Sequence, residues 1–162
     1  MVYALLADRL VCSAFLAMLA WAACSDAATF KIPDAASLGM LFLYPLHVIA
    51  SPAPTGWLAA VGIALAVFAV GLILFARGIW GGGDVKLLTG VALWAGPHAI
   101  LPVLMVTAMA GGALALVAGA MLYLQRWRAI AENAPAVAGM PLPYGVAIAC
   151  GGSFIAMQLL RS

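Results

Sequence analysis

Two aspartates at the ends of apolar segments are the residues best suited to chemistry. Asp84 lies in the run Gly81-Gly82-Gly83-Asp84-Val85-Lys86, where the glycines leave no side chain beside the carboxylate and let an extended peptide or another helix come close. Asp26 ends the first apolar run, where a carboxylate is electrostatically unfavourable at a helix C-terminus. The structural alternatives are a helix cap for Asp84 and an interfacial charge for Asp26. We favour a functional role for Asp84 and, because of the pairing, for Asp26.

Two such carboxyl groups from different helices fit the requirements of an aspartic protease. When they approach closely, both cannot ionise easily and the pair holds one proton. The ionised member can act as a general base on water, and the protonated member can polarise the scissile carbonyl and then help the amine to leave. A Ser–His or Cys–His nucleophile pair is not evident, and neither is a metal-ligand cluster. We therefore expect no metal and no cofactor. We interpret His47 and His98 as packing or interfacial residues, and the three cysteines as small buried apolar residues: Cys12, Cys24 and Cys150.

The other three carboxylates have simpler explanations. Asp34 follows Pro33 and immediately precedes an apolar run, an arrangement that predicts a helix N-cap. Asp8 is expected to neutralise its neighbour Arg9, and Glu132 lies in a polar connection where solvation suffices.

Composition restricts the class of protein that must position these residues. Of 162 residues, 67% are apolar and only 7% are charged, against about 25% charged in a typical soluble domain, and the mean hydropathy is +1.18. Seven Lys and Arg with five Asp and Glu cannot cover a soluble globule. The net charge of +2 is too small for a nucleic-acid surface. We predict an all-α, polytopic membrane protein with one domain over residues 1–162.

A spanning helix needs about 20 mostly apolar residues, and charges and turn residues divide the chain into six candidates. These are 2–23, 35–50, 57–76, a short span from about 84, 100–124 and 142–160, with the break between the fourth and fifth at Gly96-Pro97-His98. With an outside N-terminus, five basic residues lie inside and two outside, as the positive-inside rule favours. The inside residues are Lys31, Arg77, Lys86, Arg126 and Arg128. Asp26, Asp84 and the long 125–141 connection would then face the cytoplasm.

The motif pattern resembles a known family. Asp26-x5-Ile32-Pro33-Asp34, followed 58 residues after Asp26 by Gly81-x-Gly83-Asp84-x-Lys86, is similar to the prepilin peptidases of the GxGD aspartic protease class. The chain resembles most their short CpaA/TadV type and the archaeal preflagellin peptidases. The resemblance covers nearly the full length, including Pro143-Tyr144-Gly145 at the start of the last span.

The resemblance implies a function. Asp26 and Asp84 would be the catalytic pair, and Gly81, Gly83 and Lys86 would contact the substrate, a type IV or Flp-like prepilin whose leader is cut at the cytoplasmic face of the inner membrane. The chain departs from relatives at Ala27-Ala28, where a basic residue is common, and at Asp34, where Asn is usual. Longer members carry a methyltransferase segment, and we expect peptidase activity alone. Partners would be the prepilin and the bilayer, with no nucleic acid.

The competing class is a small transporter or a pilus-assembly subunit, in which the same carboxylates relay protons or ions. A transporter carboxylate should lie near the midplane of a span. Both Asp26 and Asp84 are expected at span ends, which favours the peptidase.

Overall fold

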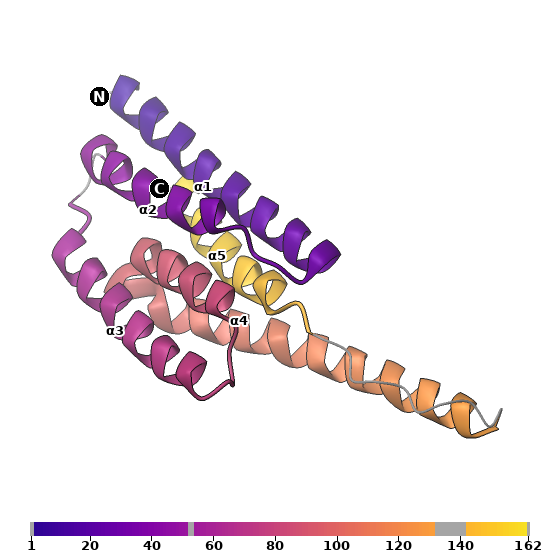
Figure 1. The fold of residues 1–162 in the computed structure, drawn as a ribbon. Helices are drawn as coiled ribbons and strands as arrows, with labels where there is room; N and C mark the ends of the chain where they lie inside the picture. Colours follow the sequence, from indigo (N-terminus) through magenta and orange to yellow (C-terminus); the bar gives the residue numbers. More distant parts are fainter. Residues whose placement is uncertain (1, 52–53, 132–141, 162) are drawn as a thin grey trace.

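The structure, a computed structural model, describes residues 2–51, 54–131 and 142–161. Over these residues the regular structure is helical, without a strand, which confirms the all-α prediction. The helices in chain order are α1 (Val2–Thr29), α2 (Asp34–Ala50), α3 (Trp57–Ala76), α4 (Gly82–Ala131) and α5 (Tyr144–Arg161). Figure 1 shows α1 running beside both α2 and α5, with α3 beside the first part of α4.

Four of these helices contain segments long and apolar enough to cross a membrane. The segments are Tyr3–Thr29, Trp57–Ala76, Gly82–Trp127 and Tyr144–Arg161, whereas α2 is shorter, with 17 residues. The structure thus supports a membrane protein with four candidate spans among the described residues, and the predicted number of six is not confirmed.

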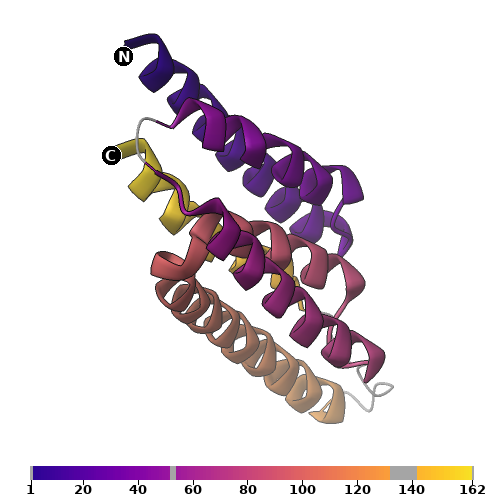
Figure 2. The same cartoon turned by 90° about the vertical axis from the view of Figure 1, so that its left-hand side faces the viewer.

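Helix α4 is interrupted at Gly96. The backbone there takes φ 57° and ψ −170°, which is not helical, and Pro97 follows. A left-handed φ suits glycine because other residues meet a Cβ clash. The ribbon turns back at this point, so the two parts of α4 run in opposite directions (Figures 1 and 2). The predicted break at Gly96-Pro97-His98 is confirmed.

Several boundaries differ from the prediction. Helix α1 continues past residue 23 to Thr29, so Asp26 lies inside its last turn, and α5 begins at Tyr144. The first part of the 125–141 connection is helical, since α4 continues to Ala131. Residues 132–141 of that connection, with Glu132, lie outside the described residues. Helix α3 has the predicted bounds.

The core joins α1, α2 and the first part of α4 around Trp94. Its ring stacks on Phe15 of α1 with centroids 4.1 Å apart and meets Tyr44 of α2 edge-on at 5.8 Å. Its indole N–H donates to the carbonyl of Met40 at 3.0 Å. Helix α5 approaches closely through Gly152, where a Cβ would lie 2.8 Å from Leu19 of α1. Small residues of this kind let helices in membranes pack backbone to backbone.

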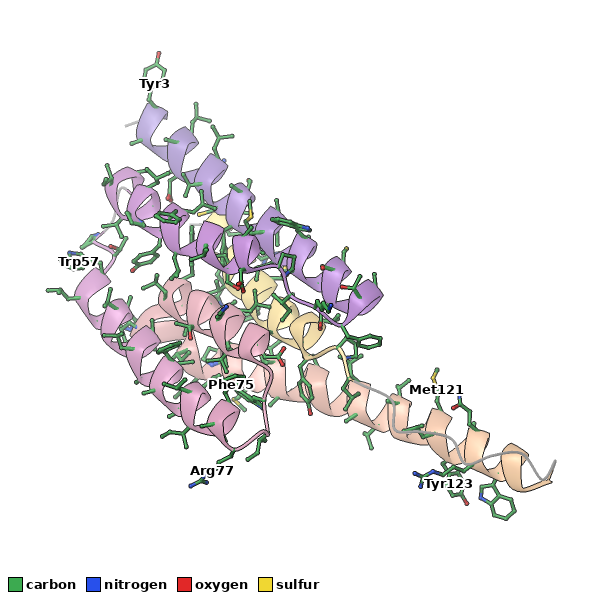
Figure 3. The ribbon with its side chains drawn as sticks, viewed as in Figure 1. Tyr3, Trp57, Phe75, Arg77, Met121 and Tyr123 are labelled. Atoms are coloured by element: carbon green, nitrogen blue, oxygen red, sulfur yellow. The ribbon has the colours of Figure 1, made fainter. Side chains whose placement is uncertain are left out.

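The outward helix faces are strongly apolar. Tyr3 is 87% exposed, Ile49 81% and Leu116 77%, and soluble monomers rarely expose apolar surface on this scale. In Figure 3, Tyr3 lies near the N-terminal end of the bundle, while Phe75 and Arg77 lie at the far end of α3 from Trp57. Both chain termini lie at the same end of the bundle (Figure 2). These faces suit contact with lipid.

Candidate active site

Asp26 is buried in the last turn of α1, with 5% of its surface exposed. Its Oδ2 accepts a hydrogen bond from the backbone N–H of Gly145 at 2.7 Å, and the backbone of Val146 also hydrogen-bonds this carboxylate. Both donors belong to the first turn of α5, whose N–H groups have no partner within the helix and carry partial positive charge. A carboxylate at the end of one helix is thus held by the start of another.

Gly145 makes this arrangement possible because it has no side chain. A Cβ at this position would lie 2.8 Å from Oδ2 of Asp26 and 2.8 Å from Cδ1 of Ile32, closer than carbon normally approaches. The sequence reasoning noted Gly145 only within the pattern that opens the last span. The hydrogen bond to Asp26 joins positions 119 residues apart, and no local signal in the sequence reveals such a contact.

Asp84 lies half-buried in the first turn of α4 and hydrogen-bonds the backbone of Gly81. A carboxylate in the third helical position that reaches back to the residue before the helix is the acidic half of a capping box. Asp84 is therefore not the N-cap residue itself, since α4 begins at Gly82, but it does stabilise the start of the helix. The hydrogen bond also fixes the direction in which the carboxylate points.

The three glycines before Asp84 each face a close neighbour. A Cβ at Gly81 would lie 2.9 Å from Oδ2 of Asp84, and one at Gly83 would lie 3.1 Å from Cβ of Ile32. A Cβ at Gly82 would lie 3.3 Å from the ring of Phe75. The contact between Gly83 and Ile32 brings the start of α4 against the segment that follows Asp26.

A tight turn after Asp26 directs that segment. The N–H of Phe30 donates to the carbonyl of Asp26 at 2.9 Å, and Phe30 has φ 53°, the left-handed conformation that ends many helices. The hydroxyl of Ser25 donates to the carbonyl of Lys31 at 2.8 Å. A non-glycine residue at positive φ is sparsely populated and concentrates at functional sites. The turn places Ile32 between Gly83 and Gly145.

Asp26 and Asp84 line one cavity of about 680 Å³, together with Gly81, Gly83 and the connection from Phe30 to Pro33. The two carboxylates are close enough to interact electrostatically. Of the residues predicted for the site, these four line the same cavity. The arrangement can hold a peptide or a water molecule against two carboxyl groups that come from different helices.

Asp84 also lines a second, largely apolar cavity of about 390 Å³. This apolar cavity lies between the two parts of α4 and the start of α5, with small residues along one wall: Ala108, Gly111, Gly112 and Ala115. Leu88, Leu104 and Ile148 are among the others that line it. Asp84 therefore lines both the cavity that it shares with Asp26 and this apolar cavity.

Lys86 forms an ion pair with Asp34, which itself lines the cavity that Asp26 and Asp84 share. Nζ of Lys86 donates to Oδ1 of Asp34 at 2.8 Å, and their side chains are 52% and 66% exposed. The prediction that Asp34 caps α2 is wrong, since Asp34 is the first helical residue and Pro33 stands at the cap without a side-chain hydrogen bond. Lys86 does not line the cavity of about 680 Å³, so its role toward a substrate stays a prediction.

Asp8 also differs from its predicted environment. Its Oδ1 lies 2.6 Å from Nδ1 of His47 of α2, in a buried hydrogen bond, and it is not paired with Arg9 as predicted. His47 is buried between helices and stacks on Trp94 at 5.1 Å. The sequence reasoning missed this contact, because Asp8 and His47 lie 39 residues apart in the chain.

Comparison with known proteins identifies a family. A model of the type IV leader peptidase family matches residues 13–116, a segment that contains Asp26, the glycine run and Asp84. Neither the curated proteins nor the solved structures contain a significant match to the chain.

Proposed function

The chain belongs to the type IV leader peptidase family, and we propose that it is an aspartic endopeptidase acting through Asp26 and Asp84. Its substrates would be type IV or Flp-like prepilins, from which it removes the leader peptide at the cytoplasmic face of the inner membrane. The observation that carries this proposal is the shared cavity: the two carboxylates come from the end of α1 and the start of α4, yet both line it. A pair of this kind is what water activation by two carboxyl groups requires.

The hydrogen bonds suggest a division of labour. Two backbone N–H groups at the start of α5 donate hydrogen bonds to the carboxylate of Asp26. Such donors favour the ionised form of a carboxyl group. We therefore assign Asp26 as the general base that takes a proton from the attacking water. Asp84, beside that charge, is assigned as the acid that donates its proton to the scissile carbonyl oxygen. When the tetrahedral intermediate collapses, Asp26 passes the water-derived proton to the leaving amine and Asp84 takes a proton back from a hydroxyl of the intermediate.

The same proposal includes six membrane passages with an outside N-terminus. The 17 residues of α2 extend about 26 Å at about 1.5 Å per residue, close to the hydrocarbon thickness of about 30 Å. The reversal of the backbone at Gly96 supports two passages by α4 in this proposal. Six passages place both termini on one side, and both lie at one end of the bundle (Figure 2). Asp26 and Asp84 then face the cytoplasm, as the positive-inside rule favours for this chain.

The apolar cavity supports a mode of substrate docking. A prepilin presents a basic leader followed by an apolar helix, so its cleavage site should lie at the inner interface. We propose that the apolar helix docks in the cavity with the small residues of α4, because such residues let two helices approach closely in lipid. The scissile bond then reaches Asp84, which lines both cavities.

A basic cytoplasmic face would not attract a basic leader, so the apolar helix of the prepilin supplies most of the recognition. Gly81 and Gly83 would border the peptide backbone, and Lys86 would contact the substrate beside them.

The second candidate is a small transporter or a pilus-assembly subunit that uses the same carboxylates for proton or ion relay. Asp26 lies in the last turn of α1 and Asp84 in the first turn of α4. Transport sites lie near the midplane of the membrane. These positions at helix ends favour the peptidase.

Purified full-length protein separates the two functions. In detergent micelles it should cleave a prepilin between leader and helix, with the products identified by mass spectrometry. In liposomes it should leave an imposed proton gradient intact. An uncut prepilin together with proton flux across the liposome membrane would favour the transporter.

A further inference from the structure

Three side chains with metal-ligating atoms meet near the N-terminal end of α1. Asp8 and Cys12 of α1 and His47 of α2 are 8%, 0% and 6% exposed, and their oxygen, sulfur and nitrogen atoms all lie within 4.8 Å of one another. Asp8 precedes Asp26 by 18 residues, which is about 27 Å along a helix. The cluster is therefore remote from the candidate active site.

One nitrogen of His47 faces both other groups. Nδ1 lies 2.6 Å from Oδ1 of Asp8 and 3.9 Å from Sγ of Cys12. A ring nitrogen offers either one proton or one lone pair, so a hydrogen-bonded state satisfies the carboxylate and leaves the thiol at long distance. A cation at their common point would instead be bound by all three atoms at once.

We propose that Asp8, Cys12 and His47 bind a divalent metal ion of borderline softness, for which Zn²⁺ is the representative. Carboxylate, thiolate and imidazole are the ligand types that Zn²⁺ takes in proteins, at about 2.0 to 2.3 Å. Small movements of these side chains meet those bond lengths, because the three atoms already converge. A thiolate ligand disfavours hard ions such as Mg²⁺.

Charge balance suits the buried position. One thiolate and one carboxylate neutralise the ion, while His47 binds as the neutral imidazole with its proton on Nε2. Binding from the neutral thiol and neutral histidine breaks the S–H bond of Cys12, forms the S–metal bond and releases one proton to solvent. The product has no net charge, which reduces the cost of burial in a low-dielectric interior.

An access path and a further ligand are available beside the cluster. A cavity of about 260 Å³ is lined by Asp8, His47 and His98, among others. His98 follows the break in α4. Either His98 or a water molecule could take the fourth position of a tetrahedral site. Because the ligands come from α1 and α2, a bound ion would fasten these two helices to each other on the side of the bundle away from Asp26.

The test uses full-length, tag-free protein in detergent, titrated with Co²⁺ as a spectroscopic substitute for Zn²⁺. We expect one Co²⁺ per chain, with a thiolate-to-Co²⁺ charge-transfer absorption that Zn²⁺ abolishes by displacement and Mg²⁺ does not. Cys12→Ser should remove this absorption and weaken Zn²⁺ binding by about 100-fold or more, since even outer-shell partners are worth about 10- to 100-fold. The matched control is Cys24→Ser, an exposed cysteine of the same helix, which should bind like the wild type.

Absence of a saturable Co²⁺ absorption in the wild-type protein would by itself overturn the proposal. Persistence of that absorption in folded Cys12→Ser would overturn it as well. Circular dichroism without metal reports whether that variant folds. If it does not, X-ray absorption at the zinc edge of the wild type decides: one sulfur with nitrogen and oxygen neighbours supports the site, and a shell without sulfur rejects it. Neither readout depends on peptidase activity.

Discussion

The backbone N–H of Gly145 donates a 2.7 Å hydrogen bond to the carboxylate of Asp26, across 119 residues of chain. This bond joins the first turn of α5 to the last turn of α1. It satisfies a helix-terminal N–H group and fixes the carboxylate beside the cavity that Asp84 also lines. The position of Asp26 therefore depends on the last helix of the chain as much as on its own.

Replacing Gly145 should disturb the site directly. A Cβ there would lie 2.8 Å from both Asp26 and Ile32, so we expect Gly145→Ala to cost about 1–3 kcal/mol of stability through overpacking and to lower prepilin cleavage more than tenfold. Thermal unfolding in detergent and a cleavage assay measure the two effects. Gly62→Ala is the control, because a Cβ at Gly62 would meet nothing within 4 Å. Equal activity of the two variants would show that the hydrogen bond does not position Asp26.

The glycines before Asp84 should differ in their tolerance to substitution. Gly81→Val and Gly83→Val would collide with Asp84 and with Ile32 respectively, while Gly82→Ala would meet the edge of the Phe75 ring at 3.3 Å, which can shift slightly. We expect cleavage to fall at least tenfold in the first two variants and less than threefold in the third, as measured by initial rates at equal membrane expression. Uniform tolerance would indicate a simple flexible turn.

Sequence reasoning predicted the elements better than their contacts. The break at Gly96-Pro97 was predictable because glycine and proline interrupt a helix whatever surrounds them. The bond between Gly145 and Asp26 and the pair of Asp8 with His47 were not, since each joins residues far apart in the chain and depends on how the helices pack. Asp34 shows the same limit. Its local sequence pattern predicts a helix cap, but its carboxylate forms an ion pair with Lys86 of another helix.

The ion pair of Asp34 and Lys86 should contribute little. Both side chains are more than half exposed, and exposed pairs are worth about 0–1 kcal/mol. We expect Asp34→Asn to keep wild-type cleavage and to lower stability by less than about 1 kcal/mol, as followed by thermal unfolding in detergent. A large loss of cleavage in this variant would give Asp34 a part in the reaction.

Filling the apolar cavity should block the substrate helix. Gly112 and Gly119 both lie in α4, and a Cβ at either would meet nothing within 4 Å, but only Gly112 lines the cavity. We expect Gly112→Leu to raise the KM for prepilin at least tenfold and Gly119→Leu to leave it unchanged. The contrary result, equal KM values in the two variants, would place the substrate helix elsewhere.

The most direct test of the central claim is the rate of prepilin cleavage by purified Asp26→Asn and Asp84→Asn. An amide keeps the size of the side chain but cannot exchange the proton that each role requires, so each variant should lose about 10²- to 10⁴-fold in rate while inserting and expressing like the wild type. Asp34→Asn, assayed beside them, should cleave normally. Cleavage at close to the wild-type rate by either Asp26→Asn or Asp84→Asn would contradict the proposed pair.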